Sequence, residues 1–306
     1  MTAVRFDLQS HSHYSDGALA PEDVVAQAAA AGVELLALTD HDTVEGVVEA
    51  LEAGRRHGVV IVPAVEITVL DGERQDLHLL GYAIDHENAA LLSMLAASRV
   101  DRDARVGRMA DALRQRGWAI DERPLAQLRA SGRSVGRPHL AAAVFTHPDN
   151  HQRLREQGLA NSTELLVAEL VDGAPSYRGR TRPTISEAIA AIHAADGLAV
   201  WAHPFWDITD PADVLDAIGR FAAQGLDGVE AFYVTFTREQ TLLLADACAQ
   251  RGLLSTGSAD YHGPEHPRFS AIGDFDLYGC DPNLGVLVAD TRHASIPRCG
   301  SSGASH

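Results

Sequence analysis

Lysine is absent from the sequence, so all 25 basic residues are arginines, and they are outnumbered by 42 acidic residues. The resulting net charge of −17 argues against a protein that coats duplex nucleic acid, because such proteins are usually basic. It does not exclude a small anionic substrate, since bound divalent metal ions can be the largest local charges in a site. We therefore expect no duplex DNA partner, whereas a small anionic substrate is compatible with the net charge.

Cysteine is also scarce. The three cysteines (Cys248, Cys280 and Cys299) are odd in number, far apart and never in a Cys-x-x-Cys pair. This pattern argues against a disulfide framework or a thiolate zinc site and fits a reducing cytoplasm. No stretch approaches the roughly 18 apolar residues of a membrane span. The first residues enter a strand pattern without a basic leader, so we expect no signal peptide, no membrane contact and a cytoplasmic location.

The rest of the chain alternates short apolar runs with amphipathic helical patterns. Strands are expected at 4–8, 34–39, 59–70, 76–84, 198–202, 228–233 and 253–258, and helices at 21–31, 43–57, 185–195, 211–223 and 238–251. Such alternation predicts an α/β fold with a mainly parallel sheet, here a barrel of about seven strands. A barrel of about 250 residues with one insertion accounts for the 306 residues.

Residues 98–183 interrupt this alternation with helical periodicity and loops but no convincing strand. We expect a helical insertion, or cap, at 98–183 between two barrel segments at 1–97 and 184–299, with a loose tail at 300–306. The insertion holds 15 arginines against 10 acidic residues, whereas the whole chain is acidic. Its electrical character therefore differs from that of the barrel.

Four arginines of the insertion recur every three residues, at Arg99, Arg102, Arg105 and Arg108. They could form one helix face. One interpretation is a solvated face whose arginines pair with nearby aspartates, namely Asp101, Asp103 and Asp111. The other is that some of them reach over a site and hold phosphate groups, which suits guanidinium geometry.

Polar side chains with metal-ligand chemistry gather at the ends of the expected strands. They are His11, His13, Asp16, His41, Glu66, His78, His203, Asp260 and His262. In a parallel α/β barrel the carboxyl ends of the strands meet at one face, which carries the active site. His78 stands near the start of its strand. The short turn at 71–75 implies an antiparallel hairpin, because parallel neighbours need a longer crossover. His78 is therefore expected at the same rim.

Six histidines and three carboxylates at one rim point to a metal centre. Without a cation, three buried carboxylates would repel each other and lose hydration. Imidazole and carboxylate ligands suit manganese, zinc or iron rather than calcium. His11 and His13 share a face if the backbone is extended, and Glu66 has two oxygens with which to bridge two ions. Nine ligands suit about three ions, and such a cluster could generate a hydroxide that attacks phosphorus.

The motifs resemble those of the PHP (polymerase and histidinol phosphatase) family. They are His11-Ser-His13 with Ser15-Asp16-Gly17, Thr39-Asp40-His41-Asp42, His203-Pro204 and Ser258-Ala-Asp260-Tyr-His262, with Glu66 and His78 in similar contexts. The resemblance spans roughly residues 4–84 and 184–270. It implies a distorted seven-stranded (β/α) barrel, PHP type, with a trinuclear metal site and phosphoesterase activity. Family members often carry histidine where Asp16 stands.

The resemblance also implies a ligand assignment. His11, His13, Glu66 and Asp260 would hold the first metal, Glu66, His78 and His203 the second, and Asp16, His41 and His262 the third. Manganese is the metal expected, with zinc, iron or magnesium as alternatives. Glu66, Asp260 and His203, together with Arg137, are the residues expected to carry catalysis.

The run from Gly136 to Leu140 resembles the branch of the family that acts on nucleotides. Members of that branch hydrolyse nucleoside 3′,5′-bisphosphates, and some trim short 5′-phosphorylated RNA. Arg137 and His139 would then contact substrate phosphates. The alternative is a helix start, with Pro138 in the first turn and His139 capping or packing. Histidinol phosphate phosphatase, a metal-dependent C–N hydrolase and a PHP-like binding module without catalysis are the competing functions. No obligate protein partner is evident.

A few other residues near the expected ligands have two interpretations each. Trp201 is expected to pack in the barrel, whereas Phe205 and Trp206 lie beyond a strand end and could stack on a base. Tyr233 could pack at the rim or contact a ligand. Asp40 and Asp42 are candidates for orienting ligand histidines, and Asp42 could instead be a helix N-cap.

Overall fold

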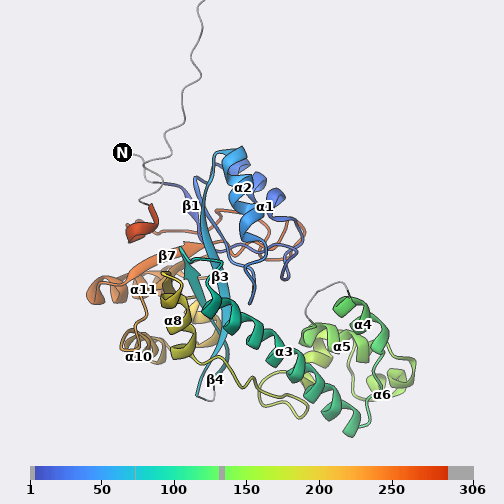
Figure 1. The fold of residues 1–306 in the computed structure, drawn as a ribbon. Coiled ribbons are helices and arrows are strands. Elements are labelled where there is room, and N and C mark those ends of the chain that lie inside the picture. Colours follow the sequence, from blue (N-terminus) through green and yellow to red (C-terminus); the bar gives the residue numbers. More distant parts are fainter. Residues whose placement is uncertain (1–3, 73, 131–134, 289–306) are drawn as a thin grey trace, which may run out of the picture. The chain divides into compact units, whose positions relative to one another are not determined.

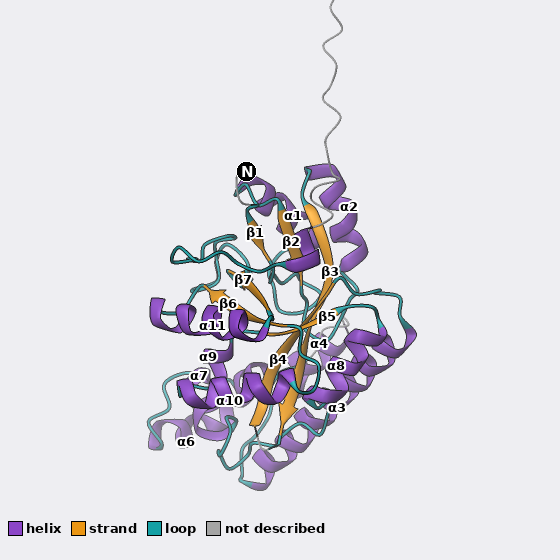
Figure 2. Cartoon of the chain, turned by 90° about the vertical axis from the view of Figure 1, so that its left-hand side faces the viewer, coloured by secondary structure: helices purple, strands orange, loops and turns teal. Residues whose placement is uncertain are grey.

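The computed structural model describes residues 4–72, 74–130 and 135–288. The expected tail (300–306), residues 289–299 of the second barrel segment and Glu73 of the expected turn lie outside the described residues. Within the described residues, seven strands stand in one sheet in chain order, β1 to β7, with helices between most of them (Figure 1, Figure 2). The predicted α/β class with seven strands is confirmed.

The chain divides into two compact units. Unit 1 holds Met1–Asp40, Val44–Ala64 and Asp227–His306, and unit 2 holds His41–Thr43 and Val65–Leu226. Strand β3 (Val60–Asp71) begins in unit 1 and ends in unit 2. The boundaries expected for the barrel segments and the insertion stay a prediction.

Unit 1 contains the parallel part of the sheet. Its elements are β1 (Phe6–Asp7), α1 (Pro21–Ala30), β2 (Leu35–Leu38), α2 (Val47–His57), the start of β3, β6 (Gly228–Tyr233), α11 (Arg238–Arg251), β7 (Leu254–Ser258) and the 3-10 helix η2 (Gly285–Val288). Parallel pairing joins β1 to β2, β2 to β3, and β6 to β7. The N–H of Leu8 donates to the carbonyl of Gly257 at 3.1 Å, so β7 also adjoins β1, as in a barrel.

Helices α1 and α2 lie side by side in unit 1 (Figure 2). Their inward faces are apolar, with Val24 and Val25 on α1 and Ala50 on α2 packed against Leu36 and Ile61 of the sheet. Pro21 opens α1, where its missing N–H costs nothing. This packing fixes the carboxyl ends of β1 and β2 and the loops that follow them.

Helix α2 begins at Val47, so the predicted start at Thr43 is wrong. Gly46 occupies the N-cap position, and Asp42 has a positive φ of 53°, outside helical geometry. The carboxylate of Asp42 accepts the N–H of Thr68 at 3.1 Å. Asp42 is therefore not the N-cap of this helix, because its side chain is used elsewhere.

Unit 2 contains the antiparallel pair and the other helices. Its elements are the end of β3, β4 (Arg74–Tyr82), α3 (Ala89–Gln115), α4 (Glu122–Ala130), α5 (Arg137–Phe145), η1 (Pro148–Asn150), α6 (His151–Glu156), α7 (Ser162–Glu169), α8 (Ile185–Ala194), β5 (Leu198–Trp201), α9 (Pro204–Asp207) and α10 (Pro211–Ala222). Strand β4 is antiparallel to β5, with Leu79 opposite Trp201. This direction is the one expected if the chain reverses after β3.

The segment predicted as an insertion is helical, and its described residues contain no strand. Helices α4, α5 and α6 gather beside the C-terminal half of α3 (Figure 1). They share an apolar core that includes Met109, Leu113, Trp118, Leu140 and Leu165. These helices therefore pack around a shared core, and α3 begins at Ala89, before the boundary expected at 98.

Helix α3 is 27 residues long, and Asn88 caps its start by accepting the N–H groups of Ala90 and Leu91. Arginine and aspartate recur along it. None of the helices in the described part of the chain combines the length and the apolar character that a membrane crossing requires.

Candidate metal centre

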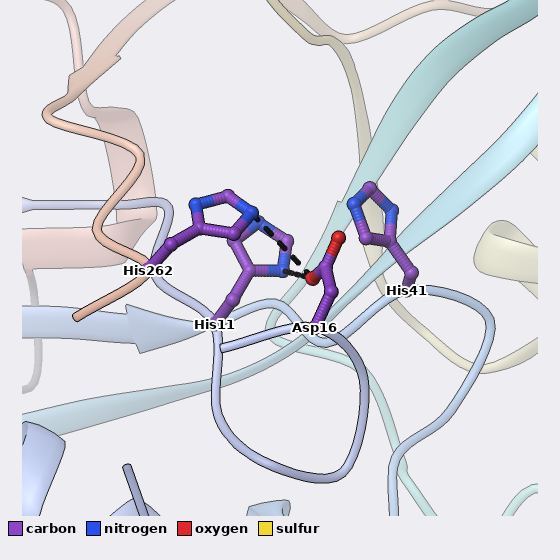
Figure 3. Close-up of side chains that lie close together, drawn as sticks. All are labelled: His11, Asp16, His41 and His262. Carbon is purple, nitrogen blue, oxygen red and sulfur yellow. Dashed lines mark ion pairs between the residues drawn. The ribbon is translucent and has the colours of Figure 1, made fainter. Parts of the chain in front are cut away.

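A first group of predicted ligands lies in unit 1, in the loops that follow β1 and β7. His11 is fully buried, and its Nε2 lies 3.1 Å from Oδ1 of Asp260. Oδ1 of Asp16 lies 3.6 Å from Nδ1 of His11 and 3.5 Å from Nε2 of His262 (Figure 3). The rings of His11 and His262 stack with centroids 4.3 Å apart. Ligand atoms about 250 residues apart in sequence therefore converge.

The loop that carries His11 and Asp16 is organised by the buried carboxylate of Asp40. Asp40 accepts the N–H of Ser12 at 2.8 Å and the hydroxyls of Ser12 and Ser15 at 2.6 Å each. Gly17 closes the loop so tightly that a Cβ there would lie 2.2 Å from the carbonyl oxygen of His11. These bonds hold Asp40 to the serines, so the expected role of orienting a ligand histidine is not the one it plays. The serine hydroxyls were missed because their partner is remote in sequence.

His13 is placed differently from His11. Strand β1 ends at Asp7, and residues 13–16 form a turn, so the His-x-His pair lies in the loop beyond the strand. His13 is exposed, with its ring 4.7 Å from that of Tyr14. Within the described residues, His13 belongs to neither group of ligand atoms that lie together.

The loop after β7 is fixed by Asp7, a fully buried carboxyl group on β1. Its Oδ1 accepts the N–H of Ala259 at 3.2 Å, and its Oδ2 accepts that of Gly273 at 2.7 Å. Burial raises the pKa of Asp7 to about 7, although these N–H donors act in the opposite direction. Asp7 therefore holds the backbone next to Asp260, whose own φ is 53°.

A second group of predicted ligands lies in unit 2, around the fully buried carboxylate of Glu66. Nδ1 of His78 lies 2.7 Å and Nε2 of His203 lies 3.2 Å from Oε1 of Glu66. Nδ1 of His41 lies 3.5 Å from Oε2. The facing nitrogens of His78 and His203 are themselves 3.3 Å apart. Three imidazoles thus surround one carboxylate.

Local backbone structure brings these four residues together. Glu66 stands in the middle of β3, and an isolated parallel bridge pairs it with His41. The N–H of Ala202 donates to the carbonyl of His78 at 3.0 Å, which aligns β4 with the end of β5. His203 follows with a φ of 27°, a conformation that turns the chain from β5 into α9. A strained backbone at a strand end is typical of functional positions.

Both groups have the chemistry of metal ligands. Converging imidazole nitrogens and carboxylate oxygens are the donors that zinc, manganese and iron take in proteins. A fully buried carboxylate such as Glu66 is costly unless a cation or hydrogen bonds compensate its charge. In each group, several such atoms lie within 4.8 Å of one another. The residues present therefore fit a metal site.

Four arginines of unit 2 gather around Asp42 and Asp76, and we call Arg102, Arg105, Arg137 and Arg180 the arginine cluster. Arg105 binds both oxygens of Asp76, at 2.8 and 3.0 Å. Asp76 also pairs with Arg137 at 3.1 Å and with Arg180 at 3.3 Å. Arg102 donates to the carboxylate of Asp42, and Arg180 lies 3.6 Å from it.

The interpretation of α3 as bearing a solvated arginine face is wrong for Arg102 and Arg105, which bind Asp42 and Asp76. It holds for Arg108, whose side chain is 40% exposed and lies 3.6 Å from Asp101. Only 4% of Arg105 is exposed. Burial would raise the pKa of Asp76, but Arg105, Arg137 and Arg180 hold it well below its usual range. Arg99 donates to the backbone carbonyl of Asp42 at 3.3 Å, so it contacts Asp42 and not an aspartate of α3. The aspartates that bind Arg102 and Arg105 lie outside α3, which is why helical spacing alone did not identify them.

Arg137 and His139 both stand at the start of α5, with Pro138 between them in the first turn. Nδ1 of His139 accepts the N–H of Gly136 at 3.0 Å, which is a capping contact. Arg137 points instead to Asp76 and lies over the ring of Tyr177, 6.0 Å from its centroid. A substrate contact by either side chain stays a prediction.

The aromatic residues near the second group have different environments. Trp201 is fully buried, 5.0 Å from the ring of Phe221, so its predicted packing role is confirmed. Phe205 is also buried, whereas 47% of Trp206 is exposed, with its ring 6.4 Å from that of His203. Trp206 is therefore the better placed of the two for stacking on a ligand.

Comparison with known proteins identifies the family. Residues 7–221 match the model of the PHP domain. The chain is 30% identical to a phosphoribosyl 1,2-cyclic phosphate 1,2-diphosphodiesterase of Eggerthella lenta, over 84% of this chain and 94% of that protein. It is 30% identical to a 3′,5′-nucleoside bisphosphate phosphatase of Chromobacterium violaceum (84% and 87%) and 31% identical to the 5′-3′ exoribonuclease Rnm of Escherichia coli (86% of each).

Solved structures agree with this family. A provisionally assigned metal-dependent phosphoesterase from Bifidobacterium adolescentis superposes with a TM-score of 0.71 at 28% identity, covering 94% of this chain and 96% of that one. The fold and the site thus define a metal-dependent phosphoesterase, a hydrolase of phosphoric ester bonds. The chain belongs to the PHP domain family.

Replacing the central carboxylate tests the second group. We expect Glu66→Gln to bind less divalent metal per chain than the wild type, because the uncharged amide removes the anionic donor that three histidines face. Metal content after dialysis, measured by inductively coupled plasma mass spectrometry, checks this. The exposed Glu156→Gln should keep the wild-type content, and equal content in all three proteins would contradict the assignment.

Asp7 predicts a pH dependence of stability. Its pKa is about 7 in the folded protein and about 4 in an unfolded chain, so only the folded state keeps the proton between these values. The stability from Asp7 is therefore present below about pH 4 and is lost as the pH rises through about 7. Urea unfolding of metal-free protein should show Asp7→Asn gaining stability over the wild type between about pH 5 and pH 8. The exposed Asp23→Asn should show no such trend, and identical behaviour of both variants would count against this pKa.

Proposed function

We propose that the protein is a phosphatase that removes a phosphate monoester from a nucleotide, most specifically the 3′-phosphate of nucleoside 3′,5′-bisphosphates such as adenosine 3′,5′-bisphosphate. Short 5′-phosphorylated RNA ends would be a second substrate. The observation that carries the proposal is the proximity, within unit 2, of a metal-ligand group and a cluster of arginines.

The two features are linked through neighbouring residues in the sequence. Asp42 follows His41 directly, and Asp76 precedes His78 by two residues. Desolvation raises the pKa of Asp207, His78 and His203 lower it, and Asp76 and Glu66 raise it. Three of the predicted ligands and Asp76, the carboxylate that binds three of the arginines, therefore stand within electrostatic range of one side chain.

The arginine cluster suits a second phosphate group. Its four guanidinium groups face two carboxylates, and Nη1 of Arg180 is buried with no hydrogen-bond partner within the described residues. Guanidinium groups bind phosphate oxygens through paired N–H donors. Asp42 and Asp76 would keep the arginines in place before substrate binds. A bisphosphate would thus have one phosphate at the metal ligands and the other at the arginines.

The metal ions would be divalent, with manganese the candidate of first choice, zinc, iron or magnesium as alternatives, and three as the expected number. Such ions supply Lewis acidity and an activated water for attack on phosphorus. The nine predicted ligands would hold these ions. Eight of them lie in the two groups described above, and His13 lies in neither. Glu66, Asp260 and His203 would act as catalytic ligands, and Arg137, with His139, would bind substrate phosphate.

The relatives differ in substrate, so the substrate needs a direct test. Phosphate release by manganese-loaded protein would be measured with adenosine 3′,5′-bisphosphate, AMP, histidinol phosphate, a five-membered cyclic ribose phosphate and a short 5′-phosphorylated RNA. We expect the highest kcat/KM for the bisphosphate. A higher kcat/KM for histidinol phosphate or the cyclic phosphate would identify that compound, and not the bisphosphate, as the preferred substrate. Inactivity of the metal-loaded protein on the whole panel would refute the proposal.

Arg137 should discriminate substrates by their second phosphate. Arg137→Ala is expected to lower kcat/KM for adenosine 3′,5′-bisphosphate about 10- to 100-fold, because a charged hydrogen bond contributes about 1.5–3 kcal/mol. The effect on a nucleoside 3′-monophosphate should be smaller, because that substrate lacks the second phosphate. Arg155→Ala, on the exposed face of α6, serves as control. Equal losses on both substrates would argue against a second-phosphate role.

Trp206 should discriminate nucleotides from other phosphate esters. Base stacking on an aromatic ring is worth about 1–3 kcal/mol, so Trp206→Ala should lower kcat/KM for the nucleotide about 5- to 100-fold. Trp206→Phe should retain most of the activity, and histidinol phosphate should be hydrolysed equally by all forms. Since Trp118 and Trp201 are buried, adenosine should quench the fluorescence of Trp206 selectively. Absence of quenching together with unchanged kinetics would rule out stacking.

A further inference from the structure

Tyr233 is the last residue of β6, and only 3% of it is exposed. Its hydroxyl donates a hydrogen bond to Oδ2 of Asp260 at 2.7 Å. Its ring packs against Phe236, with centroids 5.2 Å apart, and against Phe269, at 6.2 Å. Packing from two sides fixes where the hydroxyl points. All of these residues belong to unit 1.

The two carboxylate oxygens of Asp260 consequently have different surroundings. Oδ2 accepts the hydrogen bond of Tyr233, whereas Oδ1 lies 3.1 Å from Nε2 of His11 and 3.6 Å from Nδ1 of His262. Oδ1 is thus the oxygen that stands among the other candidate ligands. The backbone of Asp260 is held as well, because Asp7 accepts the N–H of Ala259.

We propose that Tyr233 is a positioning residue for metal binding in unit 1. By occupying Oδ2, its hydroxyl makes Asp260 present Oδ1 alone, together with His11, to the ion. This inference rests on the proposed role of Asp260 as a ligand. Tyr233 acts through Asp260 and needs no contact with substrate.

The physical reason is the freedom of a carboxylate about its last torsion. That torsion is broad and two-fold, so without a fixed hydrogen bond either oxygen can turn toward the ion. A hydrogen bond from an O–H group to a carboxylate is charge-assisted and strong. Partners of this kind orient metal ligands, and their loss typically weakens metal affinity about 10- to 100-fold.

The test is the metal affinity of Tyr233→Phe, which keeps the ring and removes the hydroxyl. Manganese binding to metal-free protein would be measured by competition with a chelator of known affinity. We expect one bound ion to be held about 10- to 100-fold more weakly than in the wild type. Cobalt, used as a spectroscopic substitute, should show an altered absorption band in the same variant.

Tyr278→Phe is the matched control, because it also removes a phenol hydroxyl near Phe236, one that lies 3.5 Å from the Phe236 carbonyl oxygen. It should bind manganese and cobalt as the wild type does. Tyr233→Phe should unfold at a lower temperature than Tyr278→Phe in the metal-free state, because it removes the donor to a buried carboxylate oxygen. A purely structural role would lower the unfolding temperature of Tyr233→Phe and leave its metal affinity unchanged, which would overturn the inference.

Asp260→Ala separates this inference from the proposed function. If Asp260→Ala loses an ion and Tyr233→Phe does not, the positioning role fails and the ligand role of Asp260 stands. If neither variant changes metal binding, Asp260 is not a ligand, and both the inference and that part of the ligand set fall. Weakened binding in both variants supports the inference.

Discussion

The buried carboxylate of Glu66 is the constraint on which the architecture of unit 2 depends. A fully buried anion is stable only where positive charge or hydrogen-bond donors compensate it. Three imidazoles from a loop, a neighbouring strand and a strand end surround it at 2.7–3.5 Å. The site therefore depends on three strands: Glu66 lies within β3, His78 lies within β4, and His203 follows the end of β5. The bend at His203 is tolerated because its ring must face that carboxylate.

A similar principle governs the supporting polar residues. Asp40 and Asp7 do not belong to the ligand groups, yet their carboxylates tie down the loops that carry ligands. Asp42 and Asp76 in turn bind the arginines and stand beside His41 and His78 in the sequence. Metal ligands and arginines are consequently fixed by the same short segments. A change in one segment would therefore disturb both features.

The sequence predicts the regular elements well where local signals decide. Strand β6 (Gly228–Tyr233) and helix α11 (Arg238–Arg251) have the expected bounds, and Thr237 and Gln240 form a capping box at the start of that helix. Periodicity and strand ends also select side chains that the fold brings together, because eight of the nine predicted ligands lie in two groups. Their binding of metal stays a prediction. Contacts between residues far apart in the sequence could not be predicted in this way. His13 is exposed at the start of a turn and lies in neither ligand group of the described residues, and Arg105 binds Asp76, 29 residues away.

We propose that the carboxylates and imidazoles of the two groups bind metal ions. The most direct measurement is anomalous X-ray diffraction from crystals of the manganese-loaded protein. We expect anomalous peaks next to the side chains of Glu66, His78 and His203 and next to those of His11 and Asp260. Manganese bound elsewhere, or no peaks in crystals that contain the metal, would contradict this proposal.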